Sequence, residues 1–164
     1  HFVPDSHVVH PPGEAFKAAL GSINGARTYV AAMCCALVAS ALDKTIAYTR
    51  ERQTFGKPLL DRQGLRWRLA DIATDLEAGR ALTYHAAELV EAGSSDAVAA
   101  AAHAKKFCAR MAPGHISACI QTMGAHGLLS SHLLGQHLAC AKLSGFVDGS
   151  TEIQNERLAA LLLD

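Results

Sequence analysis

One long apolar stretch limits the fold more than any other feature of the sequence. Residues 26–52 follow a helical pattern, with apolar side chains on nearly every face as far as Leu42. At about 1.5 Å per residue such a helix is about 40 Å long, and it needs other long helices to cover it. The weakly charged run from Thr28 to Leu42 holds fifteen residues, whereas a membrane span needs about 20. We therefore expect a buried central helix and no membrane span.

Polar turns divide the rest of the chain into further helical segments. Half of the residues are apolar and only 5% are aromatic, which suits closely packed helices. We predict an all-α fold: an up-down-up-down four-helix bundle with a short C-terminal helix, in which some helix faces bury against another chain. Residues 1–13 are proline-rich and are interpreted as a linker, and residues 14–164 as the helical domain. A short helix is expected over residues 14–20, weakly joined through Gly21 and Gly25 to a long helix over 26–52. The other expected helices are 60–92, 97–123, 131–143 and 151–163. Pro113 should kink or break the helix over 97–123.

The charge balance and the spacing of the histidines, glutamates and cysteines exclude several classes of function. Fifteen basic residues balance fifteen acidic ones, so the sequence predicts no nucleic-acid partner. Neither Glu-x-x-His nor His-x-x-x-His occurs, and we predict no metal site. The five cysteines are odd in number and form no Cys-x-x-Cys. This is typical of reduced core cysteines in a cytoplasmic protein.

A polar break at residues 144–154 (SGFVDGSTEIQ) is the most unusual segment. Gly149 permits a tight turn next to Asp148. Ser150 or Thr151 can cap the helix that follows, and Glu152 falls in its first turn, where negative charge is favoured. One interpretation is an ordinary capped corner. The other is a general base presented beside a helix N-terminus that binds an anion.

Two further polar breaks are candidates for anion binding. The first holds Arg52, Thr54, Arg62 and Gln63 around a turn between two helices. The second is the glycine turn at residues 121–127 (QTMGAHG). Each break alone is weak evidence for an anion site, because charged helix ends and glycine turns are common. Together with the helix start near Asp148, they predict a grip on one extended anionic ligand.

Four segments carry a resemblance to one family. They are residues 23–27 (INGAR), residues 52–58 (RQTFGKP) followed by Gln63, residues 121–127 (QTMGAHG) and residues 148–154 (DGSTEIQ). In this order and spacing they resemble the L-D-x-x-R, R-x-x-F-G-x-x…Q, Q-x-x-G-G-x-G and E-G-T-x-[EQ]-I-Q motifs of the acyl-CoA dehydrogenases. The match runs from about residue 14 to the end. It implies the family's C-terminal four-helix bundle, with residues 1–13 arriving from a β-domain that this sequence lacks.

The resemblance implies a flavoenzyme that desaturates acyl-CoA thioesters between Cα and Cβ. Asp148 takes the place of the family's catalytic glutamate and would remove the α-proton. The implied cofactor is FAD. The implied partners are an acyl-CoA substrate, an electron-transfer flavoprotein or another acceptor, and further copies of the chain in a dimer or tetramer.

The resemblance also assigns binding residues. The FAD would contact Arg52, Thr54, Phe55, Gln63, Gln121, Gly124, Ala125, Ser150 and Glu152, with the grip around Gln63 and Gln121 usually falling on the FAD of a neighbouring subunit. The substrate would contact Asn24, Arg27 and Gly149. The sequence departs from the family motifs at Asn24, Ala125 and Asp148, where the family has Asp, Gly and Glu. A second hypothesis follows: a non-catalytic subunit that dimerises and lends Arg52 and Gln63 to a partner's FAD.

Overall fold

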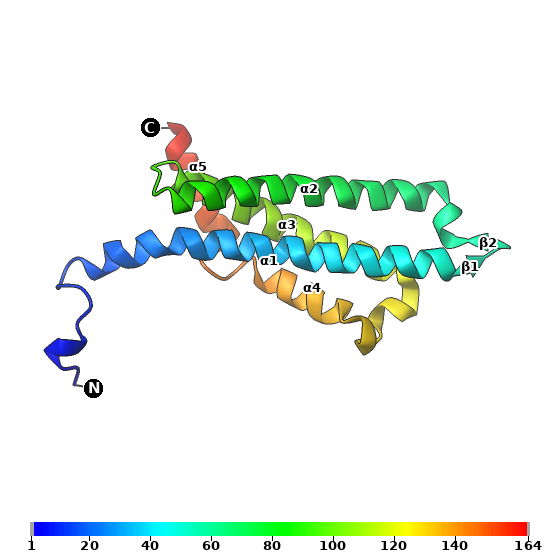
Figure 1. Cartoon of the computed structure of the whole chain (residues 1–164), viewed down its shortest axis with the longest axis horizontal. Helices are drawn as coiled ribbons and strands as arrows, with labels where there is room; N and C mark the ends of the chain where they lie inside the picture. Colours follow the sequence, from blue (N-terminus) through cyan, green and yellow to red (C-terminus); the bar gives the residue numbers. More distant parts are fainter. Residues whose placement is uncertain (1, 164) are drawn as a thin grey trace.

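The structure, a computed structural model, describes residues 2–163. Long helices run side by side, and the N-terminal segment extends away from them (Figure 1). The all-α fold class and the bundle are confirmed. The elements are η1 (Asp5–His7), α1 (Ala15–Glu51), β1 (Gln53–Thr54), β2 (Lys57–Pro58), η2 (Leu59–Asp61), α2 (Gln63–Glu91), α3 (Ala97–Met123), η3 (Gly124–Leu128), η4 (Ser130–His132), α4 (Leu134–Leu143) and α5 (Thr151–Leu163).

The first helix is longer than predicted. α1 is continuous from Ala15 to Glu51, so the expected weakening at Gly21 and Gly25 is wrong. Each glycine costs only about 1 kcal/mol in a helix, and a helix that has nucleated extends at one hydrogen bond per residue. By length and composition α1 could also span a membrane, but 44% of its most apolar 18-residue window is buried within the bundle. A core helix of a soluble protein passes the same test.

The core lies where α3 packs against α1, α2, α4 and α5. Small side chains dominate it, and Ala31, Cys34, Ala104 and Cys108 are fully buried. Such residues let helix backbones approach closely, which explains why an alanine-rich chain with few aromatic residues forms a packed bundle. One cysteine departs from the expectation, because Cys140 on α4 is exposed.

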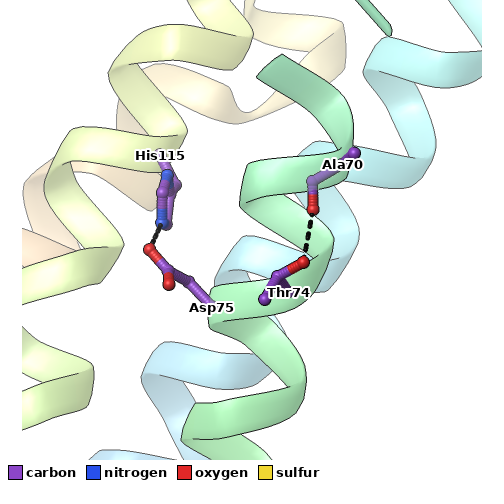
Figure 2. A network of polar contacts seen from close by, with 4 residues as sticks. All are labelled: Ala70, Thr74, Asp75 and His115. Atoms are coloured by element: carbon purple, nitrogen blue, oxygen red, sulfur yellow. Dashed lines mark hydrogen bonds and ion pairs between the residues drawn. The ribbon is translucent and has the colours of Figure 1, made fainter. Parts of the chain in front are cut away.

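Proline does not break the third helix. α3 runs without interruption across Pro113 to Met123. Of the two predicted outcomes, the break is wrong, and the kink stays a prediction. A proline inside a helix removes one backbone hydrogen bond, and the packing of α3 on four other helices offsets that loss. Just beyond it, His115 bridges to α2, where its Nε2 lies 2.8 Å from Asp75 Oδ2 (Figure 2).

The connection between α1 and α2 is a hairpin, whereas the sequence indicated only a polar break between two helices. β1 and β2 pair antiparallel, with Thr54 opposite Lys57. The two turn residues, Phe55 and Gly56, have φ of 51° and 75°, as a two-residue type I′ turn requires. A 3₁₀ turn then delays the start of α2 to Gln63. Arg62, which is extended with φ of −75° and ψ of 117°, separates that turn from α2.

The end of the chain follows the prediction more closely. α4 begins at Leu134, three residues later than expected, because Leu133 adopts a left-handed conformation with φ of 60°. The last helix, α5, spans the predicted residues 151–163.

Candidate functional site

The turn of Asp148 and Gly149 joins α4 to α5 in an unusual backbone conformation. The φ angles are 53° for Asp148 and 94° for Gly149, both in the region that costs an ordinary L-residue about 1–2 kcal/mol. Space is also short, because a Cβ at Gly149 would lie 2.9 Å from Nε2 of Gln154. Any other residue at position 149 would be strained by this φ and would displace the Gln154 amide, and the surrounding contacts hold Asp148 in its strained state.

Arg27 reaches this turn from α1. Its Nε donates to the backbone oxygen of Asp148 at 3.1 Å, and its Nη1 donates to Oδ1 of Asn24 at 3.3 Å. The Arg27 side chain is only 2% exposed. Burial lowers the pKa of Arg27, and so does the nearby charge of Arg157, whereas Asp148 raises it. The two residues predicted to line a substrate channel therefore lie together beside Asp148.

Lys105 reaches the same turn from α3. It is 1% exposed, and its ammonium group donates to the backbone oxygen of Gly149. Gln154, which is fully buried on α5, donates to the same oxygen at 3.1 Å. Burial lowers the pKa of Lys105, and Asp148 opposes that effect by raising it. Two buried cations, Arg27 of α1 and Lys105 of α3, therefore hold the Asp148–Gly149 turn. The Asp148 carboxylate raises the pKa of both cations.

The start of α5 agrees with the predicted cap. The N–H of Ile153 donates to Oγ of Ser150 at 3.5 Å, so Ser150 caps the helix. The Ser150 hydroxyl also hydrogen-bonds the carboxylate of Glu152, which lowers the pKa of Glu152. Both residues lie within a few positions of Asp148, where the family resemblance expects cofactor contacts.

The hairpin at the end of α1 carries other predicted cofactor residues. Nη2 of Arg62 donates to the backbone oxygen of Thr54 at 2.5 Å, and its guanidinium lies 5.6 Å from the centre of the Phe55 ring. The Phe55 side chain is 98% exposed. The hydroxyl of Thr54 is buried, and no partner for it occurs among residues 2–163. Arg52 and Gln63 are exposed beside this hairpin.

The glycine turn after α3 lies at the same end of the bundle. The ring of His126, in η3, packs on Tyr48 near the end of α1, with ring centroids 5.4 Å apart. Gln121, Gly124 and Ala125 are exposed there. Gly124 has φ of 62°, so the predicted turn depends on a glycine.

The three polar breaks do not meet in one chain. Arg27, which contacts the Asp148 turn, lies 25 residues before Arg52, and Arg52 is the residue that caps the end of α1. At 1.5 Å per residue this is about 38 Å. The three breaks of a single chain are therefore too far apart to share one ligand, and the predicted grip would need breaks from neighbouring chains. The hairpin and the Gln121 turn form one end (Figure 1), and the Asp148 turn lies far along the helices from it.

Two residues of the Asp148 site were missed from the sequence. Lys105 and Gln154 are both buried and both bind the Gly149 carbonyl. A signal for Lys105 was present, because it lies on the helical stripe of Ala101, Cys108 and Ala112, all of which are buried. A lysine on an apolar stripe needs a buried partner. Gln154 is the last residue of the segment DGSTEIQ that carries the family resemblance, but no role was predicted for it. Within the described residues, no group of three or more His, Cys, Asp or Glu side chains could hold a metal ion.

Comparisons with known proteins place this fold in one family. Residues 13–163 match the family model described as acyl-CoA dehydrogenase, C-terminal domain. The chain belongs to the acyl-CoA dehydrogenase family. The mitochondrial short/branched chain specific acyl-CoA dehydrogenase of Rattus norvegicus is 38% identical over 157 residues, which are 96% of this chain and 36% of the relative.

Solved structures agree with that result. Butyryl-CoA dehydrogenase from Megasphaera elsdenii superimposes with a TM-score of 0.94 at 30% identity, covering 99% of this chain and 42% of the other. PigA, solved with FAD and proline, has a TM-score of 0.92 at 28% identity, with 98% and 42% covered. The chain thus spans about two fifths of the length of the relatives it matches.

Proposed function

We propose that this chain is the C-terminal part of an FAD-dependent acyl-CoA dehydrogenase that desaturates an acyl-CoA thioester between Cα and Cβ, with Asp148 as the base. The observation that carries the proposal is the clamp on the Asp148–Gly149 turn, in which buried Arg27 and Lys105 hold the two backbone carbonyls. A base must be held in one position to reach a weakly acidic proton. The bonds to its backbone fix the position of Asp148, and the residue is half-buried at the surface.

The backbone also offers a hydrogen-bond donor to the negative charge that develops on the thioester oxygen. Among the residues that the structure describes, none accepts a hydrogen bond from the N–H of Asp148. In the proposed reaction, this N–H donates to the thioester oxygen while the carboxylate of Asp148 takes the α-proton. A donor and a base on one residue lower the barrier, because the proton becomes acidic only when the oxygen is hydrogen-bonded.

The hairpin end fits the adenosine half of FAD. The buried hydroxyl of Thr54 has no partner in residues 2–163, and it can donate to a phosphate oxygen. Phe55 projects as an exposed aromatic surface on which an adenine can stack. Arg52, Gln63 and the turn of Gln121, Gly124 and Ala125 complete this proposed grip. Near Asp148, Ser150 and Glu152 would contact the flavin, and Asn24, Arg27 and Gly149 the substrate. When bound, FAD supplies the acceptor for the hydride that leaves Cβ.

The separation of the two ends supports a homo-oligomer. About 38 Å along α1 lie between Arg27 and Arg52, so we infer that the hairpin of one chain binds the FAD that serves Asp148 of another. Exposed Trp67 on α2 and Leu128 in η3 offer apolar surface for such contacts. We infer a dimer or tetramer. An electron-transfer flavoprotein as acceptor and a cytoplasmic location remain predictions.

The test uses the complete enzyme with Asp148→Asn. We expect the visible absorbance of the oxidised flavin to stay unbleached on adding acyl-CoA, with a reduction rate lower by at least about 10³-fold. Asp71→Asn, which changes an exposed carboxylate on α2, is the matched control and should reduce normally. Unchanged reduction in Asp148→Asn would overturn the assignment of the base.

The same experiment distinguishes the proposed function from the second hypothesis. If the chain is a non-catalytic module that lends groups to a partner's FAD, flavin reduction survives Asp148→Asn but FAD binding is lost in Arg52→Ala. If the proposed function is correct, Asp148→Asn keeps its FAD and loses only the reduction by substrate.

A further inference from the structure

Two cysteines from different helices meet in the core between α1 and α3. The Sγ atoms of Cys35 and Cys108 lie 3.7 Å apart. Thr83, from α2, places its hydroxyl oxygen 4.0 Å from the first sulfur and 3.8 Å from the second. The proposed function uses none of these three residues.

A glycine makes room for the pair. A Cβ at Gly79 of α2 would lie 3.2 Å from each of the two sulfurs and 3.0 Å from Cε of Met111. Such contacts are tighter than ordinary packing, so a larger residue at position 79 would push the sulfurs aside. The absence of this side chain lets Cys35 and Cys108 face each other.

Cys35 can be reached from the surface. It lines a cavity of about 210 Å³ between α1 and α2, together with Ala32, Ala36, Arg80, Thr83 and Tyr84. A volume of about 30 Å³ is the share of one water molecule, so the cavity admits a small polar oxidant. Cys108 is fully buried behind Cys35. The order of access is therefore Cys35 first and Cys108 second.

The two thiols also differ in acidity. The hydrogen bond from Cys108 lowers the pKa of Cys35 to about 7, with further lowering from Thr83 and from the charge of Arg80. The same contact with Cys35, followed by burial, raises the pKa of Cys108. Cys34, next to Cys35 on α1, has its pKa raised by burial. Because the thiolate is the nucleophile, Cys35 is the member of the group that reacts.

We propose that Cys35 is an oxidation site for hydrogen peroxide and that Cys108 resolves it to a disulfide between α1 and α3. The Cys35 thiolate attacks one peroxide oxygen, so an S–O bond forms, the O–O bond breaks and hydroxide leaves. The sulfur is oxidised to a sulfenic acid and the peroxide is reduced. Cys108 then attacks the Cys35 sulfur, the S–S bond forms and the S–O bond breaks. The hydroxyl leaves with the Cys108 proton as water.

The disulfide would lie close to the Asp148 site. Cys108 is three residues, or about one helical turn, after Lys105, and Cys35 is eight residues after Arg27. These are the two helices whose cations hold the Asp148–Gly149 turn. A disulfide between Cys35 and Cys108 would tie α1 to α3 beside these cations, with the sulfurs moving from 3.7 Å to the covalent length of about 2.05 Å.

The test treats the complete protein with increasing hydrogen peroxide, blocks free thiols with iodoacetamide and maps peptides by mass spectrometry without reduction. We expect a linked peptide pair containing Cys35 and Cys108, lighter by two hydrogens and lost on reduction. In Cys108→Ser, the linked pair is absent, and the sulfenic acid of Cys35, trapped with dimedone, rises several-fold. Cys140→Ser removes an exposed thiol elsewhere and should leave the linked pair unchanged.

Other outcomes would overturn the proposal. They are a protein that keeps Cys35 reduced while Cys140 is oxidised, or a disulfide that joins a different pair. Because the wild-type protein already gives the decisive peptide, the test holds even if a variant fails to fold. It also holds if the enzyme proves inactive, since it measures the thiols and not the turnover.

Discussion

The ammonium group of Lys105, on α3, donates to the backbone carbonyl of Gly149, in the turn before α5, and the lysine is buried in the bundle. A buried lysine without a partner is very costly. Here the partner is a backbone oxygen next to Asp148, and Arg27 makes the corresponding bond to the Asp148 carbonyl. The bundle thus devotes two buried cations to one turn.

Replacing Lys105 by Met should separate positioning from stability. The change removes the desolvation cost of a buried charge and leaves no buried group unpaired, because Asp148 is only half-buried, so we expect the melting temperature to change little. Gln154 still binds the Gly149 carbonyl, but the turn loses one of its anchors. In the complete enzyme we expect flavin reduction by substrate to slow at least about tenfold, or about 1.4 kcal/mol. Stopped-flow reduction beside a thermal melt measures both, and a normal rate with a lowered melting temperature would contradict the positioning role.

Gly149→Ala should destabilise the protein. Its φ of 94° is unfavourable for alanine, and the new Cβ would meet Gln154 at 2.9 Å and Nη2 of Arg27 at 3.4 Å. We expect a loss of about 1–3 kcal/mol in the free energy of unfolding, measured by urea denaturation. Gly114→Ala is the control, because Gly114 lies inside α3 with open space around it. This change should stabilise the helix by about 0.5–1 kcal/mol.

Phe55→Asn should separate the stability of the hairpin from its proposed binding role. Phe55 has φ of 51° and is 98% exposed, and asparagine tolerates this conformation better. We expect stability to stay equal or to rise by up to about 1 kcal/mol. FAD affinity of the complete enzyme should fall about tenfold, because stacking of a base on an aromatic side chain contributes about 1–3 kcal/mol. Phe16→Ala, at another exposed aromatic residue, should leave FAD affinity unchanged, and an unchanged affinity in Phe55→Asn would remove Phe55 from the site.

His137 should make the fold sensitive to acid. Burial lowers the pKa of His137, and the charge of Lys44 lowers it further. Within the described chain, its Nδ1 is buried without a partner. A folded-state pKa below the unfolded value of about 6.5 means that the unfolded chain binds the proton first. Stability should therefore be unaffected above about pH 7 and should fall as the pH drops through about 6.5. Melting temperatures at a neutral and an acidic pH should differ less in His137→Leu than in the wild type, and an equal drop in both would exclude His137 as the cause.

Much of the architecture follows from local sequence. The apolar pattern of α1, the cap at Ser150 and the glycine at position 149 determine helices and turns through contacts a few residues apart. The motifs resembling those of acyl-CoA dehydrogenases indicated the family, because they occur in one order along the chain. Local patterns erred where packing outweighed propensity: Gly21 did not interrupt α1, and Pro113 did not break α3.

The tertiary structure decided which residues share a site. Lys105 and Arg27 are 78 positions apart in sequence, and only the packing of α3 on α1 brings both to the Asp148–Gly149 turn. The same packing places Cys108 against Cys35, although nothing in the spacing of the cysteines predicts that contact. Residues paired across helices depend on how the helices rotate and slide against each other, and close packing of small side chains sets that arrangement. The sequence by itself determined the helices, the turns and the family resemblance. The three-dimensional packing determined the clamp around Asp148, its distance from the hairpin and the thiol pair, because each depends on atoms that only the folded bundle brings together.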